Sequence, residues 1–242
     1  MPYLWGQLRG AIPLLVHGDP YLMSLIWVTI RVALVSTACA VVIGLPMGLA
    51  LGLGRFRGRR ALQLLANASL ALPPVVVGIV VLMLLVPQGP FGSLRIEYTL
   101  RAVYVVQTIL ALPYIVALTP AAIQGLAPGL LDQARALGAS WRQLSVLALR
   151  EAKVGVMAAV IAAMGAAVSE VGAVIIVGGN FEGHDETLAS ALLAEFTYTA
   201  NDYYETAIAI ALGLMVLALI ASLTIIQQRS GGIRLRFRAG TP

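Results

Sequence analysis

The chain has 242 residues, of which 60% are hydrophobic and 11% are charged, and its mean hydropathy is +0.90. Water-soluble globular domains average roughly 45–50% apolar and about 25% charged residues, so this composition excludes an ordinary soluble protein and indicates an integral membrane protein. The net charge of +5 requires no nucleic-acid partner, because positive charge also gathers beside anionic lipid. No change in composition marks a second domain, so we expect one membrane domain over residues 1–242.

The N-terminal residues 1–20 contain a short apolar stretch that Pro13 interrupts. No small-residue cleavage site follows a proper hydrophobic region, so a cleaved signal peptide is not predicted. We expect instead a short helix that lies at the membrane surface.

Five apolar stretches are long enough to cross a bilayer core of about 30 Å, which requires roughly 20 helical residues. They cover residues 22–54, 62–86, 102–125, 154–178 and 204–227. The first stretch is long for one crossing, so we expect it to tilt or to project beyond the membrane. It contains the only cysteine, Cys39, which we expect to be buried as a small apolar residue.

The cations between these stretches predict the orientation, because Lys and Arg accumulate in short cytoplasmic loops. Three segments carry four cations each, and these are Arg55, Arg57, Arg59 and Arg60, then Arg135, Arg142, Arg150 and Lys153, then Arg229, Arg234, Arg236 and Arg238. The segment 179–203 contains acidic residues and no Lys or Arg. We therefore expect the N-terminus outside and the C-terminus in the cytoplasm.

The cytoplasmic segment 126–153 carries signals for two short helices. The first helix can run to Leu137, with Gly138 as a left-handed C-terminal cap. Ser140 and Gln143 have the spacing of a capping box for the second helix. We expect an apolar stripe on this unit, formed by Leu131, Ala134, Leu137, Trp141 and Leu144. Such a projecting unit either docks a partner protein or lies on the lipid surface.

Prolines and ionisable residues mark possible functional positions inside the apolar stretches. Pro73, Pro74 and Pro113 can bend helices where a gate could hinge, or can form static kinks. Glu170 is an intramembrane carboxylate, for which we expect a structural or gating role, since a carboxylate on the pathway would repel an anion. Arg31 could pair with Glu170, attract anions or reach lipid phosphate.

The acidic segment 179–203 is too polar to cross a membrane. Asp185 can cap a helix from Glu186 to about Phe196. The acids Glu182, Asp185 and Glu186 suit protein docking better than oxyanion binding. The two histidines, His17 and His184, are far apart in sequence, and the chain is predicted to bind no metal.

The segment 132–153 resembles the signature of the inner-membrane permease subunits of ABC importers, which is E-A-A, three residues, Gly and, after nine more residues, I-x-L-P. Asp132, Gln133 and Ala134 take the first three places and Gly138 keeps its own, whereas Arg150 and Glu151 stand where Leu-Pro is usual. The stretches "LREA" and "AVSEVGAVIIVGGN" at 167–180 are similar to the tungstate-type branch of the molybdate, tungstate and sulfate permeases. Further similar stretches are "LALPPVVVGIVVLMLL", "GPFG" and "QTILALPYIV".

This resemblance implies a type I ABC importer permease fold, with about five transmembrane helices, an N-terminal interfacial helix and a cytoplasmic coupling helix. The residues that would dock into a groove on a cytoplasmic ATPase are Asp132, Ala134, Leu137, Gly138, Ala139, Ser140 and Trp141. For Asp132, a solvated charge is the alternative to a cation on the ATPase. The chain has no G-x-x-x-x-G-K-[ST] sequence, so ATP and Mg²⁺ are expected on the ATPase and no cofactor on this chain.

The resemblance also implies a homodimer, two ATPase copies and an extracytoplasmic oxyanion-binding protein, in the cytoplasmic membrane of a bacterium or archaeon. Tungstate is the expected cargo, and molybdate or sulfate is the alternative. A passive ion channel remains a candidate of another class. A membrane enzyme is not indicated, because no nucleophile with a base and no cluster of metal ligands stands out.

Overall fold

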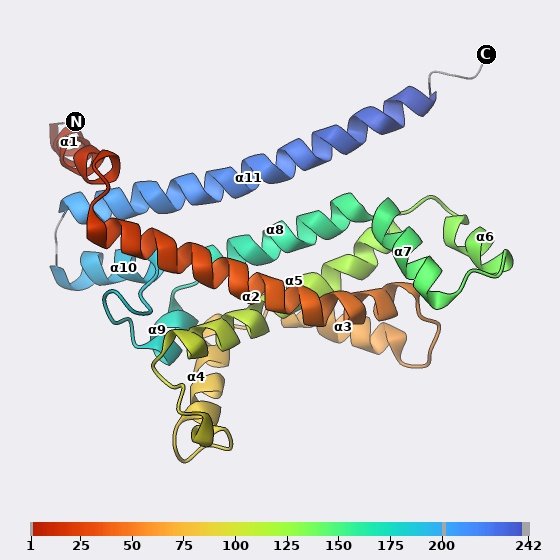
Figure 1. Ribbon diagram of the computed structural model, residues 1–242, viewed down its shortest axis with the longest axis horizontal. Helices are drawn as coiled ribbons and strands as arrows, with labels where there is room; N and C mark the ends of the chain where they lie inside the picture. The colour runs from red at the N-terminus through yellow and green to blue at the C-terminus, as the bar shows by residue number, and fades with distance from the viewer. Residues whose placement is uncertain (1, 200–201, 239–242) are drawn as a thin grey trace. The chain divides into compact units, whose positions relative to one another are not determined.

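The computed structural model describes residues 2–199 and 202–238, and every regular element among them is helical (Figure 1). In chain order these are α1 (Pro2–Val16), α2 (Pro20–Leu53), α3 (Arg59–Ser69), α4 (Pro74–Leu85), the 3-10 helix η1 (Gly92–Leu94), α5 (Leu100–Gln124), α6 (Leu130–Ala136), α7 (Trp141–Glu151), α8 (Lys153–Ser169), α9 (Gly172–Gly178), α10 (Leu188–Ala194), the π-helix η2 (Glu195–Thr199) and α11 (Asp202–Arg238). The predicted all-α class is confirmed. The side chains of the four C-terminal arginines lie outside the described residues.

Among the described residues, three helices are each long and apolar enough to cross a membrane, namely α2, α5 and the Tyr203–Gln228 part of α11. Two helix pairs, α3 with α4 and α7 with α8, qualify only as pairs, and each is bent by more than 40° at a short break. The number of spans is five if each bent pair is one span. Where the sequence predicts one span over 154–178, the structure has two helices, α8 and α9, separated at Glu170 and Val171.

The chain forms two compact units, and the first contains Met1–Cys39, Leu72–Ala111 and Met164–Leu217. One apolar cluster in this unit joins α2, α4, α5 and α9, with Val32, Val81, Val103 and Val174 among its buried residues. A second cluster joins α1, α2, α10 and α11 through Ala11, Leu22, Leu188 and Ile208. The second cluster holds α10 against α1, α2 and α11 by van der Waals packing.

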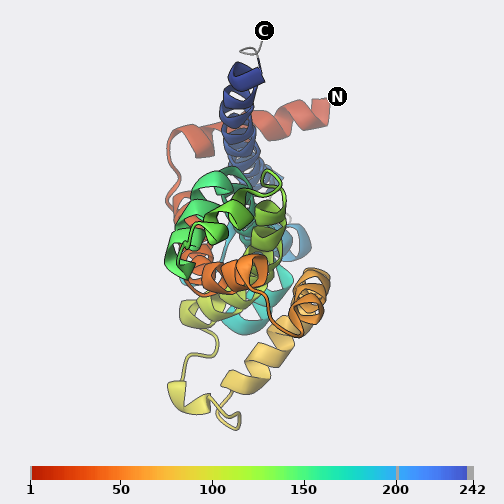
Figure 2. The ribbon, with the colours of Figure 1, turned by 90° about the vertical axis from the view of Figure 1, so that its right-hand side faces the viewer.

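Helices α4 and α9 approach each other closely because small residues lie at their contact. A Cβ atom added at Gly78 would lie 2.9 Å from the Cα atom of Ala173, and one added at Gly172 would lie 2.5 Å from Cγ2 of Val75. Such spacing is typical of membrane helices that pack backbone against backbone. Figure 2 shows α4 leading into the loop that carries η1. After that loop, the backbone N–H of Tyr98 donates to the carbonyl of Val177, 2.9 Å away.

The second unit contains Ala40–Ala71, Leu112–Ala163 and Ala218–Pro242. Here Gly44, Gly48 and Gly52 of α2 lie one turn apart and face α5, where added Cβ atoms would lie between 2.5 and 3.0 Å from side-chain atoms of Ile115, Thr119 and Ile123. The residues that complete the core of this unit are Leu53, Ile123, Leu144, Ala148 and Ala152. The core therefore joins the ends of α2 and α5 to α7 and to the residue that follows it.

The prediction that Cys39 is buried is wrong. Cys39 is exposed, because it lies on a face of α2 with the exposed residues Val35 and Val42. An exposed apolar face on a membrane helix fits contact with lipid or with another protein chain.

Candidate functional site

The turn between α6 and α7 has the geometry of a Schellman motif. The backbone N–H of Gly138 donates to the Arg135 carbonyl and that of Ala139 donates to the Ala134 carbonyl, each at 3.0 Å. Gly138 has φ +81° and an added Cβ atom would meet nothing within 4 Å. The sequence prediction of a left-handed cap at this glycine is confirmed.

Helix α7 begins with the predicted capping box. The Ser140 side chain accepts a hydrogen bond from the Gln143 backbone N–H, and the Gln143 side chain accepts one from the Ser140 backbone N–H at 2.8 Å. The two orphan donors at this helix end are thereby satisfied. The turn is consequently rigid on both sides of Gly138.

The apolar stripe predicted along α6 and α7 divides into a buried and an exposed part. Leu144 is buried in the core of the second unit, and Ala134 and Ala139 pack against that core. Leu137 is 89% exposed and Trp141 is 51% exposed, so the prediction that they continue the stripe is wrong. The chain reversal at Gly138 turns these two large side chains outward. A large exposed apolar pair on a capped turn is the usual composition of a protein docking surface.

Asp132 already has cationic partners in its own chain. Its Oδ1 atom lies 2.9 Å from Nη2 of Arg55 and 2.8 Å from Nη1 of Arg135. The Asp132 and Arg55 side chains are mostly exposed, so this pair contributes little to stability. The proposed docking role of Asp132 thus competes with these internal ion pairs.

Two arginines secure the C-terminal end of α2. Arg135 of α6 donates to the Leu53 carbonyl at 2.9 Å, and Arg59 donates to the Leu51 and Gly52 carbonyls at 2.6 and 3.2 Å. These carbonyls have no partner within the helix, and cations are favourable at this end of the helix dipole. Arg135 therefore links the α6–α7 turn to α2. Sequence analysis assigned these arginines only to topology, although Arg59 lies close enough behind α2 to suggest a cap.

The prolines predicted as hinges have different positions. Pro73 is the N-cap of α4 and Pro74 is its first residue, so both lie at the break between α3 and α4. The missing N–H of Pro74 costs nothing at this position. Pro113 lies inside the unbroken α5. The Pro73–Pro74 pair lies where the helix direction changes by 100°.

Glu170 lies at the break between α8 and α9 and accepts a hydrogen bond from the Ala173 backbone N–H at 2.9 Å. A carboxylate there satisfies an orphan donor at the start of α9. Arg31 lies over the ring of Tyr104, with 6.0 Å between its Cζ atom and the ring centroid. Within the described part of the chain, Arg31 and Glu170 form no ion pair, so the structure favours a structural role for Glu170 and does not join the two.

Two of the three acids predicted to dock a binding protein are buried. Asp185 is 1% exposed and accepts hydrogen bonds from the backbone N–H groups of Asn180 and Phe181, each at 3.0 Å. Glu186 is 5% exposed and accepts from the Tyr21 hydroxyl at 3.1 Å. Glu182 is exposed. Asp185 and Glu186 thus act inside the protein, and only Glu182 is accessible.

Burial sets the electrostatics of these two acids. Desolvation raises the pKa of the Asp185 carboxyl, and the hydrogen bonds from Phe181 and Asn180 oppose that rise. Desolvation also raises the pKa of Glu186, against the opposing hydrogen bond from Tyr21. Both groups therefore bind protons more readily than exposed carboxyls do.

Helix α10 begins at a different residue from the predicted one. Its N-cap is Thr187, which forms a capping box with Ser190, and the Leu188 N–H donates to Thr29 Oγ1 at 2.8 Å. Asp185 was the predicted cap, and this prediction is wrong because its carboxylate binds the backbone that precedes it. The bond to Thr29 attaches α10 to α2.

Sequence reasoning missed several buried polar atoms on α2 and α5. Thr37 Oγ1, Tyr104 Oη and Gln107 Nε2 are buried and have no hydrogen-bond partner among the described residues. Buried polar groups in proteins are nearly always paired, so these atoms are exceptions within the described residues. In sequence they look like isolated polar residues in apolar helices. No group of three or more potential metal ligands occurs among the described residues.

Residues 44–231 match the model of a family described as "Binding-protein-dependent transport system inner membrane component". The chain belongs to this family. It is 35% identical over 92% of its length to a probable anion ABC transporter permease protein of Haloferax volcanii, and 32% identical over 90% of its length to the tungstate uptake system permease protein TupB of Peptoclostridium acidaminophilum. The alignments cover 93% of each relative.

Solved structures of ABC transporters confirm the type I importer permease fold. An inward-facing form of the MetNI methionine transporter matches with a TM-score of 0.71 over 87% of this chain and 96% of the other, at 22% identity. A bacterial transporter that imports the acidic polysaccharide alginate matches with a TM-score of 0.68 over 93% of this chain and 83% of the other, at 15% identity. The fold that the sequence resemblance implied is thus the observed one.

Proposed function

We propose that this chain is the membrane-spanning subunit of an ATP-driven importer for a tetrahedral oxyanion. It works as a homodimer with two copies of a cytoplasmic ATPase and an extracytoplasmic binding protein. The observation that carries this proposal is the exposed pair Leu137 and Trp141 on the capped turn between α6 and α7. Movement of this turn is transmitted to α2 through the bond from Arg135 to the Leu53 carbonyl.

The proposed topology has five spans, with the N-terminus outside and the C-terminus and α6–α7 in the cytoplasm. Arginines crowd the loop after α2 and the α6–α7 region, whereas segment 179–199 holds acids and no Lys or Arg. This arrangement would put the docking turn on the side where ATP is available.

The proposed cargo is tungstate. Two relatives of 32% and 30% identity are named as tungstate permeases, whereas relatives named for sulfate and molybdate permeases are 28% and 25% identical. Two acids of the segment 179–199, Asp185 and Glu186, are buried, so fewer carboxylates face a dianion than the sequence suggests. Molybdate and sulfate stay as the alternatives that the experiment compares.

The test is ATP hydrolysis by the permease and its cognate ATPase, copurified and reconstituted in lipid. Binding protein loaded with tungstate, molybdate or sulfate is added in turn, and Gly138→Trp is the uncoupled variant. We expect the largest stimulation with tungstate-loaded binding protein, and none in the variant, because a bulky side chain at φ +81° displaces the turn. Failure of any ATPase to copurify, or transport without ATP, would instead support a passive channel.

A further inference from the structure

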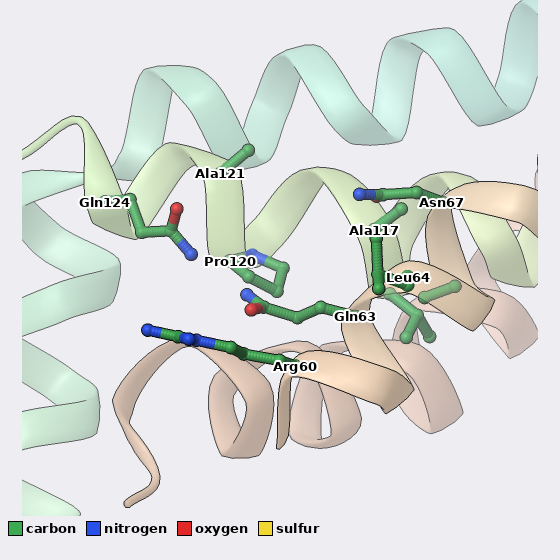
Figure 3. A pocket seen from close by; sticks show the side chains of 10 residues that line it. Arg60, Gln63, Leu64, Asn67, Ala117, Pro120, Ala121 and Gln124 are labelled. Atoms are coloured by element: carbon green, nitrogen blue, oxygen red, sulfur yellow. The ribbon is translucent and has the colours of Figure 1, made fainter. Parts of the chain in front are cut away.

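A groove on the second unit is lined by polar side chains of α3 and by the C-terminal half of α5. Its volume is about 290 Å³, and its polar residues are Arg60, Gln63, Asn67 and Gln124. Figure 3 shows Arg60 and Gln63 extending from α3 with their polar ends toward Pro120 and Gln124 of α5. The space is far larger than a single water molecule needs.

The lining residues share one helix face by their spacing. Arg60, Gln63 and Asn67 are separated by three and four residues, so they lie one above another along α3. The leucines Leu62 and Leu65 are exposed on other parts of the helix. Helix α3 therefore turns these polar residues toward α5, together with Leu64, which also lines the groove.

The groove supplies hydrogen-bond donors without a competing acid. One guanidinium and three amide groups line it, and no Asp or Glu does. None of the four polar side chains has a hydrogen bond or ion pair within the described part of the chain. Arg59 and Arg55, in contrast, are already bound to carbonyls and to Asp132. Arg60 is thus free to form the paired N–H contacts that guanidinium makes with an oxyanion.

A wider basin opens onto the groove. It has a volume of about 700 Å³, shares Arg60, Gln63 and Gln124 with the groove, and adds Arg55, Arg57 and Arg59. No carboxylate lines the basin. A concave surface with cations of one sign concentrates anions near it. The basin leads from an electropositive surface to a smaller site rich in donors.

We infer that the groove between α3 and α5 binds a tetrahedral oxyanion, with Arg60 as the charged donor and the amides of Gln63, Asn67 and Gln124 as neutral donors. This inference rests on the proposed function, in which the anion is the cargo as it leaves toward the cytoplasm. A single cation against a dianion gives weak, salt-dependent binding, which suits a site that an ion must leave. A lipid phosphate has the same chemistry, and the experiment separates the two sources.

The test measures equilibrium binding of tungstate to the permease–ATPase complex without binding protein, at low and high salt. We expect binding to the wild-type complex that weakens as salt rises, and a loss of about tenfold in affinity for Arg60→Gln, because a hydrogen bond to a charged group is removed. Arg60→Lys keeps the positive charge but loses the paired N–H donors of the guanidinium, so its affinity for tungstate should be intermediate. Arg101→Gln is the matched control, because Arg101 is exposed and lines neither the groove nor the basin, and should stay within about twofold.

Lipid is tested on the same variants by native mass spectrometry of complexes purified with phosphatidylglycerol. Retention of phosphatidylglycerol that depends on Arg60, without Arg60-dependent tungstate binding, overturns the assignment to cargo. Equal tungstate binding by wild type and Arg60→Gln overturns the site altogether. Hydrolysis stimulated by loaded binding protein is recorded in the same preparation. Loaded binding protein could still stimulate ATP hydrolysis while Arg60→Gln binds tungstate as tightly as wild type does. In that case the groove is not the anion site, and the proposed function is unaffected.

Discussion

The α6–α7 region and the segment 179–199 are both polar interruptions of an apolar chain, but they place their functional groups in opposite environments. In α6–α7 the acid Asp132 is exposed and two large apolar side chains, Leu137 and Trp141, face outward. In 179–199 the acids Asp185 and Glu186 are buried and hydrogen bonded. Polarity in the sequence therefore marks a surface for a partner in one segment and an internal network in the other.

The internal network should be the more fragile of the two. Asp185→Ala removes the acceptor for the partly buried backbone N–H groups of Asn180 and Phe181, and a hydrogen bond to a charged group contributes about 1.5–3 kcal/mol. We expect a loss of roughly 2–5 kcal/mol in stability, measured by thermal unfolding in detergent. Glu182→Ala, at an exposed acid of the same segment, should change stability by about 0.5 kcal/mol or less. Equal effects of the two substitutions would contradict the difference in burial.

In α6–α7 the position that matters for stability should be Arg135 and not Asp132. Arg135→Met removes the hydrogen bond to the Leu53 carbonyl and should cost about 1–2 kcal/mol. Asp132→Asn removes exposed ion pairs and should cost about 0.5 kcal/mol or less, decreasing further with salt. Denaturant unfolding of both variants checks the order. A larger loss in Asp132→Asn would show that the exposed pairs hold this region.

Gly138 and Gly183 offer a matched comparison between the segments. Both have a left-handed backbone, with φ +81° and +73°, and an added Cβ atom at either meets nothing within 4 Å. Alanine at either position should cost about 1 kcal/mol from backbone strain alone. Only Gly138→Ala should also lower ATP hydrolysis stimulated by the binding protein, because only that turn carries the docking residues. Equal loss of stimulation in both variants would contradict the assignment.

The pH dependence of stability should come from the buried acids. Burial raises the pKa of Asp185 and Glu186, so the folded state holds protons at pH values where the unfolded state has lost them. The stabilisation from this protonation is fully present only below the ordinary carboxyl pKa of about 4. Stability should therefore fall as the pH rises through the raised values. Glu186→Gln should flatten this slope in thermal unfolding, because it removes one of the two titrating groups. An unaltered slope in Glu186→Gln would exclude this source.

Local signals predicted the parts of the site that depend on neighbouring residues. The cap at Gly138 and the Ser140–Gln143 box follow from short spacings and were found in the sequence. Helical periodicity did not predict that Leu137 leaves the apolar stripe, because the periodicity is lost where the chain reverses at the Schellman turn. The bond between Arg135 and the Leu53 carbonyl joins residues far apart in sequence, and no local pattern reports it.

Two features of the fold were predicted wrongly from hydropathy. Long apolar runs predicted α2 and α5 well, but hydropathy cannot tell a continuous span from the α8–α9 pair, since Glu170 breaks the helix without lowering the mean hydropathy much. Burial of Cys39 was inferred from an apolar run, whereas membrane helices also expose apolar faces.

The central claim, that the α6–α7 turn docks an ATPase, is tested most directly by the affinity of the purified ATPase for the permease in nanodiscs. Trp141→Ala should weaken binding by roughly 30-fold and Leu137→Ala by somewhat less, since buried aromatic anchors contribute about 2 kcal/mol or more. Val146→Ala is the control, because Val146 is 43% exposed on the same helix and lies about 140° around the axis from Trp141. Wild-type affinity in the Trp141 and Leu137 variants would contradict the account.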